Sequence, residues 1–355
     1  CGSAWISTTP CRTEQRKTSA LRDSFDSGEE NQATGILEEI NYVLSSLKKK
    51  LTGLGNQDMD EYVFWIERHG KGVVFHTAPL YTGNLLSDVL YSRLDSMVLT
   101  SGTLRLNNSF DYFIQELGLS DFEDVIYEKV RPAFDLTNQA RILIADELPS
   151  PNWEQDTIYM EACSQAIHEI SRVCTGNLLA LFTSHRHLLQ TYELLKEPLG
   201  GEGMRVLAHD IDGDRYHLVD ALKSGGKTLL LGTGSFWEGI DIQGDSLQCV
   251  IITKLPFPVP DSPLLEAKVE LYKKKGCNPF AGIFLPVCTT KLLQGIGRLI
   301  RSESDFGFAV ILDSRLTAKA YGRFILESLP EVPVLTGGVG FICDAIEETA
   351  AARSL

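Results

Sequence analysis

The chain has 355 residues, enough for two to three domains at about 150 residues per domain. Hydrophobic residues make up 43% and charged residues 23% of it, which excludes disordered, collagen-like and coiled-coil proteins. The formal net charge of −14 disfavours a surface built for non-specific DNA binding, but leaves room for a local basic groove.

No segment predicts membrane insertion or export. The longest apolar runs, such as 308–312, are far shorter than the roughly 18 residues that cross a bilayer. The chain begins with Cys1 and has no charged segment followed by an apolar one, so we expect no secretory signal and a start within a longer chain. Its 8 cysteines form no CxxC pair, which argues against a zinc site or a disulfide framework. We expect reduced thiols and a cytoplasmic location.

The first part of the chain predicts a helix and a hairpin. Leucines and an isoleucine recur at helical spacing over 36–51, and three lysines at the end suit the negative end of a helix dipole. Two β-rich runs at 61–68 and 72–76 flank a turn at Gly70 and predict a β-hairpin that ends by Pro79.

After Ser96 strands and helices alternate. We expect strands near 97–100, 141–145, 178–183, 205–208, 227–232, 248–254 and 308–312, and helices that include 154–174, 185–195, 216–222 and 316–329. Apolar strands alternating with helices predict an α/β fold with a parallel sheet covered on both faces, and ligands at the carboxyl ends of the strands. The proline-rich stretch 255–263 predicts a stiff loop before helix resumes at Leu264.

Two segments imitate nucleotide-binding motifs in the wrong context. The run ALKSGGKT at 221–228 has the glycines, lysine and threonine of a phosphate loop, but a predicted helix precedes it and a strand follows. The run ILIADE at 142–147 is an apolar strand ending in two acids, but two prolines follow, and an ordinary surface turn is expected. His185 and His187 are two residues apart on a helix and should face different ways, against joint metal binding.

The segment 294–301 predicts a phosphate clamp. Arg298 and Arg301 lie three residues apart, on one side of a predicted helix, after small residues that permit close approach. Arginine suits phosphate because its guanidinium binds two oxygens at once and stays charged. The alternative is a solvated arginine face with an aspartate partner.

The segment 232–241 follows a buried strand and offers glycine-freed backbone, hydroxyls and carboxylates. Thr233 and Ser235 suit contact with a phosphate backbone, while Asp241 could hold a ribose hydroxyl or orient an arginine. The alternative is a glycine-rich turn with a buried Trp237.

In their order along the chain, these segments resemble the carboxyl-terminal half of the DinG and XPD-like superfamily 2 DNA helicases, with the DinG branch fitting best. Helicase motifs III, IV, V and VI are resembled by 98–104, 180–184, 234–241 and 294–301. The segments 252–260, 311–316 and 321–323 also look like that branch, so the resemblance covers roughly residues 60 to 330.

The resemblance implies a RecA-like motor that uses ATP and Mg²⁺ and moves along single-stranded DNA from 5′ to 3′, in DNA repair or replication. Arg298 and Arg301 would be arginine fingers, Gln294 would position the nucleotide or the water, and Glu238, Gly239 and Asp241 would bind the nucleotide. Thr183, Ser184, Thr233 and Ser235 would contact the DNA backbone, and Ser101 and Thr103 would couple hydrolysis to domain movement.

The resemblance also implies parts that this sequence does not hold. The phosphate loop, the DEAH box and the four cysteines of an iron–sulfur cluster would lie amino-terminal to residue 1. Residues 1–58 would be the end of the helical arch insertion, 59–105 the returning segment of the first motor domain with motif III, and 106–355 the second RecA-like domain with motifs IV, V and VI. We expect a monomer that needs its amino-terminal half, and that alone neither binds ATP tightly nor hydrolyses it.

Two other functions remain open from the residues alone. The chain could be a catalytically inactive nucleic-acid-binding or regulatory module, although such a module has no chemical need of Arg298, Arg301, Glu238 and Asp241. It could belong to a nuclease, since some relatives carry an exonuclease domain, but that domain would lie upstream and no acidic metal cluster is recognisable here.

Overall fold

The computed structural model describes residues 4–5, 37, 40–42, 44–45, 61–70, 72–130, 135–152, 154–237, 247–300 and 302–353. Glu238, Gly239, Asp241 and Arg301, which the sequence assigns to the nucleotide site, lie outside these residues. Most of the predicted helix at 36–51 also lies outside them, and the members of it that are described are helical.

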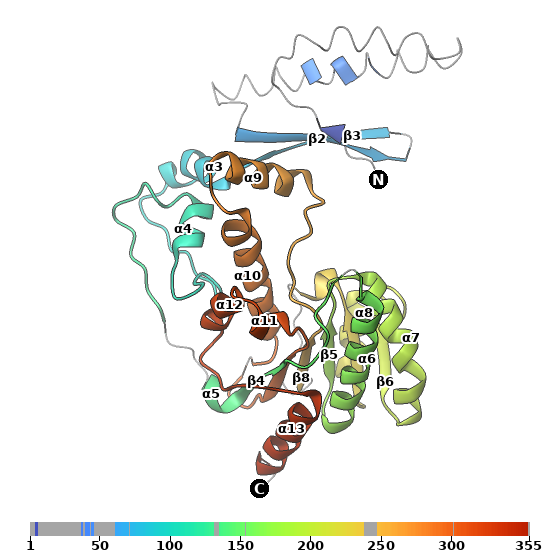
Figure 1. Ribbon diagram of the computed structural model, residues 1–355. Helices are drawn as coiled ribbons and strands as arrows, with labels where there is room; N and C mark the ends of the chain where they lie inside the picture. Colours follow the sequence, from blue (N-terminus) through green and yellow to red (C-terminus); the bar gives the residue numbers. More distant parts are fainter. Residues whose placement is uncertain are drawn as a thin grey trace, which may run out of the picture. The chain divides into compact units, whose positions relative to one another are not determined.

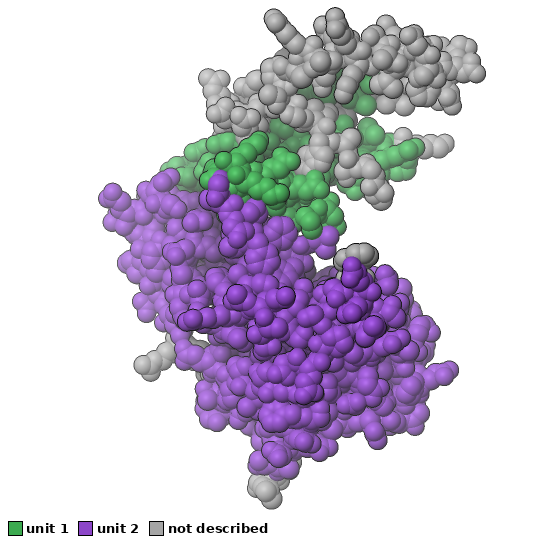
Figure 2. All heavy atoms as spheres, in the orientation of Figure 1, with its two compact units in different colours: residues 1–93, 260–275 green, residues 94–259, 276–355 purple. Residues whose placement is uncertain are grey.

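Contacts divide the chain into two units, coloured separately in Figure 2. Unit 1 is Cys1–Arg93 with Pro260–Lys275, and unit 2 is Leu94–Val259 with Gly276–Leu355. The proline-rich stretch therefore leads from unit 2 into unit 1. The sequence-based domain limits at 58/59 and 105/106 stay a prediction.

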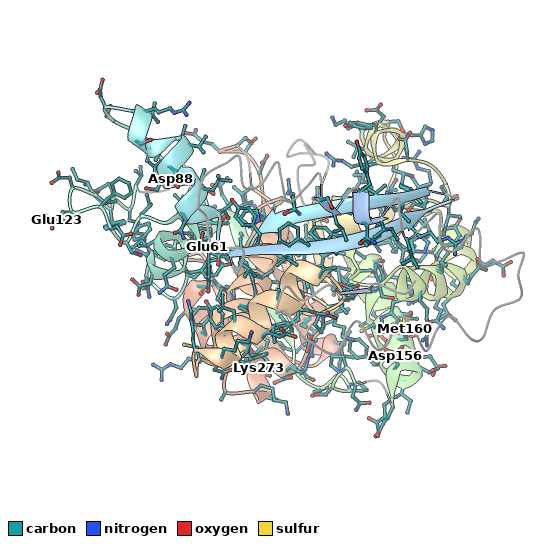
Figure 3. All side chains as sticks on the ribbon, turned by 90° about the horizontal axis from the view of Figure 1, so that it is seen from above. Glu61, Asp88, Glu123, Asp156, Met160 and Lys273 are labelled. Atoms are coloured by element: carbon teal, nitrogen blue, oxygen red, sulfur yellow. The ribbon has the colours of Figure 1, made fainter. Side chains whose placement is uncertain are left out.

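Unit 1 contains the predicted hairpin. Strands β2 (Tyr62–His69) and β3 (Gly72–Pro79) pair antiparallel, and Gly70 in the turn has a positive φ of 60°. The other elements of this unit are β1 (Ala4–Trp5), α3 (Thr82–Val89), the 3₁₀ turn η2 (Tyr91–Arg93) and α9 (Pro263–Lys274). Glu61, labelled in Figure 3, ties α3 to the hairpin, because its Oε1 accepts from Asn84 Nδ2 at 3.4 Å.

Unit 2 is built on a seven-stranded parallel sheet in the order β10-β4-β9-β8-β5-β7-β6. Its strands are β4 (Ala140–Ala145), β5 (Leu178–Leu181), β6 (Arg205–Ala208), β7 (Thr228–Gly232), β8 (Cys249–Ile252), β9 (Gly307–Ile311) and β10 (Val334–Gly337). Its helices are α4 (Asp111–Leu117), α5 (Leu136–Gln139), α6 (Asp156–Val173), α7 (His185–Gly201), α8 (Arg215–Lys223), α10 (Leu285–Ile296), α11 (Arg315–Ala318), α12 (Gly322–Ser328) and α13 (Val339–Arg353). The 3₁₀ turn η3 (Gly234–Phe236) follows β7, and the π-helix η5 (Phe280–Phe284) precedes α10.

The sheet is buried on both faces, as the continuous apolar strands predict. Alternate strand residues such as Leu178 and Leu179 enter two separate core clusters. Helices α6, α7 and α13 contribute to the first cluster, and α8, α10 and α12 contribute to the second. Figure 1 labels these six helices. The predicted α/β arrangement, a parallel sheet with helices on both faces, is therefore confirmed.

Two local predictions are wrong. Residues 97–100 form no strand; the side chain of Val98 is 89% exposed, and no strand among the described residues pairs with this segment. The predicted helix over 316–329 is broken into α11 and α12, and the break brings the Leu316 carbonyl oxygen so close to residue 322 that only glycine fits there. None of the described helices combines the length and apolar character that crossing a membrane requires.

Candidate functional site

The predicted DNA contacts leave two neighbouring strands at the same edge of the sheet. β5 and β7 are parallel and in register to Leu181 opposite Gly232, and the amide of Phe182 donates to the Gly232 carbonyl at 2.8 Å. Thr183 and Ser184 follow β5, and Thr233 and Ser235 follow β7. Thr183 and Ser235 are exposed, and the other two are partly buried. The fold thus presents four hydroxyls where ligands of parallel sheets bind.

The turn after β7 depends on its glycines. Gly234 has a φ of 48° and begins η3, in which the amide of Phe236 donates to the Thr233 carbonyl at 3.0 Å. A Cβ on Gly232 would lie 2.6 Å from the Cβ of Phe236, so only glycine lets Phe236 fold back on the strand. This tight turn keeps Thr233 and Ser235 at the strand end.

Trp237 joins the three motifs of unit 2. Its ring is buried, and its Nε1 donates to the carbonyl of Phe182, next to the first pair of hydroxyls, at 2.9 Å. Helix α10 packs on the ring at Gly295, whose added Cβ would lie 3.3 Å from the Trp237 Cζ3. The carbonyl of Trp237 accepts from Arg298 Nη2 at 3.1 Å. The segments assigned to motifs IV, V and VI therefore meet around one residue.

The two candidate residues of motif VI that are described lie at the end of α10. Gln294 is in its last turn, and Arg298 lies beyond its end at Ile296. The expectation that Arg298 and Arg301 share one helix face is wrong for Arg298, because Gly295 and Gly297 weaken the helix and the chain leaves it in a tight turn. The guanidinium nevertheless sits favourably by the negative end of the helix dipole.

Ser101 and Thr103 contact each other, and among the described residues no hydrogen bond joins either to another candidate residue. Their hydroxyls are 3.3 Å apart, and the amide of Thr103 donates to the Ser101 Oγ at 3.2 Å. They form a local turn, as short hydroxyl side chains often do. Their coupling role stays a prediction.

Sequence reasoning missed the group at the end of β6. His209 Nδ1 lies 3.4 Å from Thr233 Oγ1, and Asp210 Oδ1 lies 3.5 Å from His209 Nε2. His185, at the start of α7, has its Nε2 3.7 Å from the other oxygen of Asp210. Adjacent parallel strands predict that β6 and β7 end together, but the strand order was not predicted.

His187 points away from His185, which confirms that the two histidines face different partners. His187 Nε2 is 2.9 Å from Asp156 Oδ2, and Arg186 Nη2 is 3.2 Å from the same oxygen. Figure 3 labels Asp156 and Met160 in the first turns of α6. Burial raises the pKa of Asp156, but the His187 hydrogen bond and nearby cations outweigh it and leave that pKa lowered.

Asp313 and Arg315 fix the proline-rich stretch where it leaves the sheet. Asp313 is fully buried and accepts from Arg315 Nη2 at 2.6 Å and from the Leu255 amide at 2.8 Å. The Arg315 guanidinium lies 5.6 Å from the ring centroid of Phe257. Burial lowers the pKa of Arg315, but Asp313 reverses this and raises it. The pair holds the segment after β8 in place.

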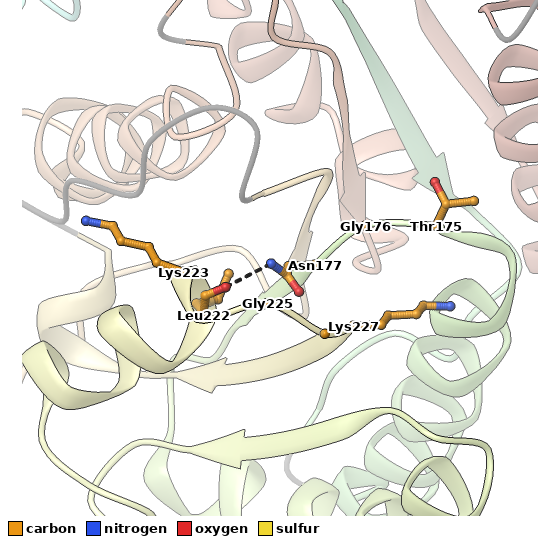
Figure 4. A pocket seen from close by; sticks show the side chains of 8 residues that line it. Thr175, Gly176, Asn177, Leu222, Lys223, Gly225 and Lys227 are labelled. Carbon is orange, nitrogen blue, oxygen red and sulfur yellow. Dashed lines mark hydrogen bonds between the residues drawn. The ribbon is translucent and has the colours of Figure 1, made fainter.

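The glycine-rich run at 221–228 has the context that the sequence predicts, with α8 before it and β7 after it. A cavity of about 390 Å³ adjoins the run (Figure 4) and is lined by Thr175, Gly176, Asn177, Leu222, Lys223, Gly225, Gly226 and Lys227. It lies at the amino ends of β5 and β7, because Asn177 and Lys227 directly precede those strands. Arg205 Nη2 donates to the Gly225 carbonyl at 2.7 Å, so the loop offers a carbonyl to a cation. The run is not a phosphate loop.

The acidic run at 142–147 likewise belongs to the sheet. Its apolar part is β4, which pairs with β9 and β10, and the Asp146 amide donates to the Gly337 carbonyl at 3.3 Å. Within the described part of the chain, no group of three or more His, Cys, Asp or Glu side chains could hold a metal ion.

Comparisons with known proteins agree with the motifs. Residues 167–332 match the family model described as a helicase C-terminal domain. The chain is 37% identical over 303 residues to the 3'-5' exonuclease DinG of Bacillus subtilis, covering 84% of this chain and 32% of that protein. It is 35% identical over 273 residues to the ATP-dependent DNA helicase DinG of Photobacterium profundum, covering 75% of this chain and 39% of that protein. The chain thus spans about a third to two fifths of the length of these relatives.

Solved structures of XPD share the fold. The chain matches an apo XPD structure with a TM-score of 0.55 at 16% identity, covering 94% of this chain and 64% of that one. A second XPD helicase structure gives a TM-score of 0.54 at 15% identity, covering 94% and 58%. At this identity the likeness concerns the fold alone.

Proposed function

Because this chain belongs to the DinG family of XPD-like superfamily 2 helicases, as a carboxyl-terminal region, we propose that it forms half of an ATP-dependent DNA helicase motor. The observation that carries the proposal is the junction at Trp237, which contacts Phe182, Gly295 and Arg298 and so joins motifs IV, V and VI. A motor needs this connection, because its nucleotide and DNA contacts must move together.

Arg298 and Arg301 act as arginine fingers in this proposal. Two features of Arg298 suit the role: its side chain is only partly buried, and its Nη2 is held by the carbonyl of Trp237. Trp237 directly precedes Glu238, the first of the nucleotide-binding residues assigned from the resemblance, with Gly239 and Asp241. A guanidinium fixed there can neutralise charge on a transferring phosphoryl group.

Gln294 orients the nucleotide or the attacking water. It lies in the last turn of α10, one turn before Arg298, so the two side chains share one support. ATP supplies the phosphoryl chemistry when bound. We assign the phosphate loop and the Mg²⁺ ligands to an amino-terminal half outside this chain, together with any iron–sulfur cluster.

The hydroxyls after β5 and β7 contact the backbone of single-stranded DNA. These hydroxyls belong to Thr183, Ser184, Thr233 and Ser235. Because they carry no charge, they can bind successive phosphates weakly and release them again. In this proposal the motor is a monomer that moves along DNA from 5′ to 3′. Ser101 and Thr103 couple ATP hydrolysis to domain movement. The motor acts in DNA repair or replication.

The test is DNA-stimulated ATP hydrolysis by the full-length protein carrying Arg298→Ala or Arg301→Ala. We expect either change to lower turnover about 10³-fold, because the negative charge that develops on the phosphoryl group in the transition state loses a stabilising guanidinium. Arg323→Ala is the matched control, since Arg323 is exposed on α12 and pairs with Glu327 at 2.6 Å. Wild-type turnover in both variants would mean that Arg298 and Arg301 are not arginine fingers.

The alternative is a catalytically inactive nucleic-acid-binding or regulatory module. The same assay separates it, because a module without catalysis shows no DNA-stimulated hydrolysis even in the wild-type full-length protein. The exonuclease named in the Bacillus subtilis relative belongs to a protein of which this chain matches only 32%.

A further inference from the structure

The hydroxyl of Thr233 has a histidine beside it. His209 Nδ1 lies 3.4 Å from Thr233 Oγ1, and the His209 ring packs edge-on against Phe236 with the ring centroids 4.8 Å apart. The His209 amide donates to the Leu231 carbonyl at 3.0 Å, so both backbones are fixed at one strand edge. The side chain of His209 is only 14% exposed. The contact is thus built into the sheet.

The turn after Thr233 does not use this hydroxyl. Thr233 precedes η3 in the position of a helix cap, yet its side chain caps no amide there. Among the described residues, Thr233 Oγ1 has His209 Nδ1 as its hydrogen-bond partner. The hydroxyl is therefore available to a ligand, under the control of one imidazole.

The other nitrogen of His209 faces a carboxylate. Asp210 Oδ1 lies 3.5 Å from His209 Nε2, and Asp210 has a φ of 64°, a strained backbone for a residue other than glycine. A carboxylate at Nε2 favours the tautomer that carries its proton there. In that tautomer Nδ1 carries no proton, so it accepts a hydrogen bond from the Thr233 hydroxyl.

We propose that His209 is a positioning residue that decides whether the Thr233 hydroxyl donates to the imidazole or to a DNA phosphate. With His209 neutral, Thr233 offers a phosphate only its lone pairs. When Nδ1 takes a proton from solvent, it donates to Thr233 Oγ1, and the hydroxyl proton turns to the phosphate. Binding of single-stranded DNA is thereby coupled to proton uptake. The inference rests on the proposed function, because the contact of Thr233 with DNA is itself part of that proposal.

Among the described residues, Asp210 is the charged group that contacts this ring. Thr233 and Phe236, from the segment after β7, do not titrate in the relevant range. Asp210 comes from the same loop as His209, and His185 from α7 faces the same carboxylate. Among the described residues no hydrogen bond joins His185 to Thr233, so an effect of His185 on DNA binding should not depend on that hydroxyl.

The experiment measures binding of a labelled oligothymidylate to the full-length protein by anisotropy across about pH 5 to 8, where histidines titrate. We expect wild-type affinity to rise roughly tenfold as the pH falls, the size of one good hydrogen bond. The Thr233→Val variant should bind the oligothymidylate weakly and lose this pH dependence, although it retains His209. Calorimetry in buffers of different ionisation enthalpy should show proton uptake in the wild type and none in this variant.

His209→Gln and His209→Leu form the matched pair. A glutamine amide can donate to Thr233 Oγ1 at any pH, so His209→Gln should bind tightly and without pH dependence. Leucine cannot donate, so His209→Leu should bind more weakly than His209→Gln at every pH. Thermal unfolding midpoints check that the two His209 variants fold. The same measurement is made on Thr233→Val, and Thr233→Ala is used instead if Thr233→Val does not fold.

The outcomes are distinguishable. Wild-type pH dependence in Thr233→Val would show that His209 does not act through Thr233, and would overturn the inference while leaving the helicase proposal intact. Equal binding by the glutamine and leucine variants would also overturn it. If the wild-type protein binds no single-stranded DNA at any pH, the proposed function fails and the inference fails with it.

Discussion

Trp237 contacts three segments that are far apart in the sequence. Its indole N–H reaches Phe182, its ring supports Gly295, and its carbonyl holds Arg298. The nitrogen of Lys291 also lies 5.6 Å from the centroid of its ring. A single buried residue, through its indole and its backbone carbonyl, therefore links the predicted DNA contacts to the predicted arginine finger.

Asp156 gives a pH-dependent prediction. Burial raises its pKa, but the hydrogen bond from His187 and the charges of Lys254 and Arg186 leave the net pKa below its ordinary 3.8. The carboxylate therefore adds stability that is present above the unfolded-state pKa and is lost as the pH falls through the lower folded-state pKa. We expect Asp156→Asn to lower the thermal unfolding midpoint at neutral pH, and the difference to vanish in acid.

The control for this prediction is Asp220→Asn, at an exposed carboxylate on α8. It should leave the midpoint nearly unchanged at neutral pH, because exposed charges contribute little. A difference between Asp156→Asn and the wild type that stays constant into acid would mean that the ionised carboxylate is not the cause.

At the residue scale, the sequence predicted the hydroxyls better than their surroundings. Thr183 and Thr233 follow apolar runs, and any parallel sheet places such residues at strand ends. His209 and Asp210 were missed, because their contacts depend on a left-handed backbone at Asp210 and on the strand order beside β7. Neither is encoded in a local pattern of residues.

At the element scale, the strands were the easiest to predict. The six predicted strands from 141 to 312 appear within about two residues at each end, because burial on both faces demands continuous apolar runs. β10 and α13 were missed. The residues of β10 are mostly exposed, so its sequence lacks that signal. The end of α10 was misplaced because its glycines permit either helix or turn.

Gly322 provides a prediction about the break between α11 and α12. A Cβ at this position would overlap the Leu316 carbonyl, which is backbone and cannot move cheaply. We expect Gly322→Ala to lower the free energy of unfolding by roughly 1–3 kcal/mol, as overpacking does. Urea unfolding followed by circular dichroism measures the change.

Gly200→Ala is the matched control for Gly322→Ala. Gly200 lies in α7, and an added Cβ would meet no atom within 4 Å. Alanine there should be neutral or stabilising by up to about 1 kcal/mol, since it favours helix. Equal losses in both variants would show that the contact with Leu316 is not what keeps residue 322 a glycine.

At the scale of the whole molecule, the negative net charge agrees with the uncharged DNA contacts. With a net charge of −14, the protein gains little from general attraction to phosphates, so binding must depend on local groups. The hydroxyls after β5 and β7, which we propose as DNA contacts, would be such groups. A motor that releases and rebinds its strand at every step benefits from contacts of this strength.

The last prediction concerns the division of the motor between two parts of a longer protein. This chain alone should show no DNA-stimulated ATP hydrolysis, because an arginine finger without a phosphate loop and Mg²⁺ ligands has no transition state to stabilise. Mixing it with the matching amino-terminal half should restore phosphate release that depends on single-stranded DNA. The same mixture with Arg298→Ala should stay inactive, which ties the recovery to this chain's own contribution. Hydrolysis by this chain alone would instead assign catalysis to the run at 221–228, against the position of that run between α8 and β7.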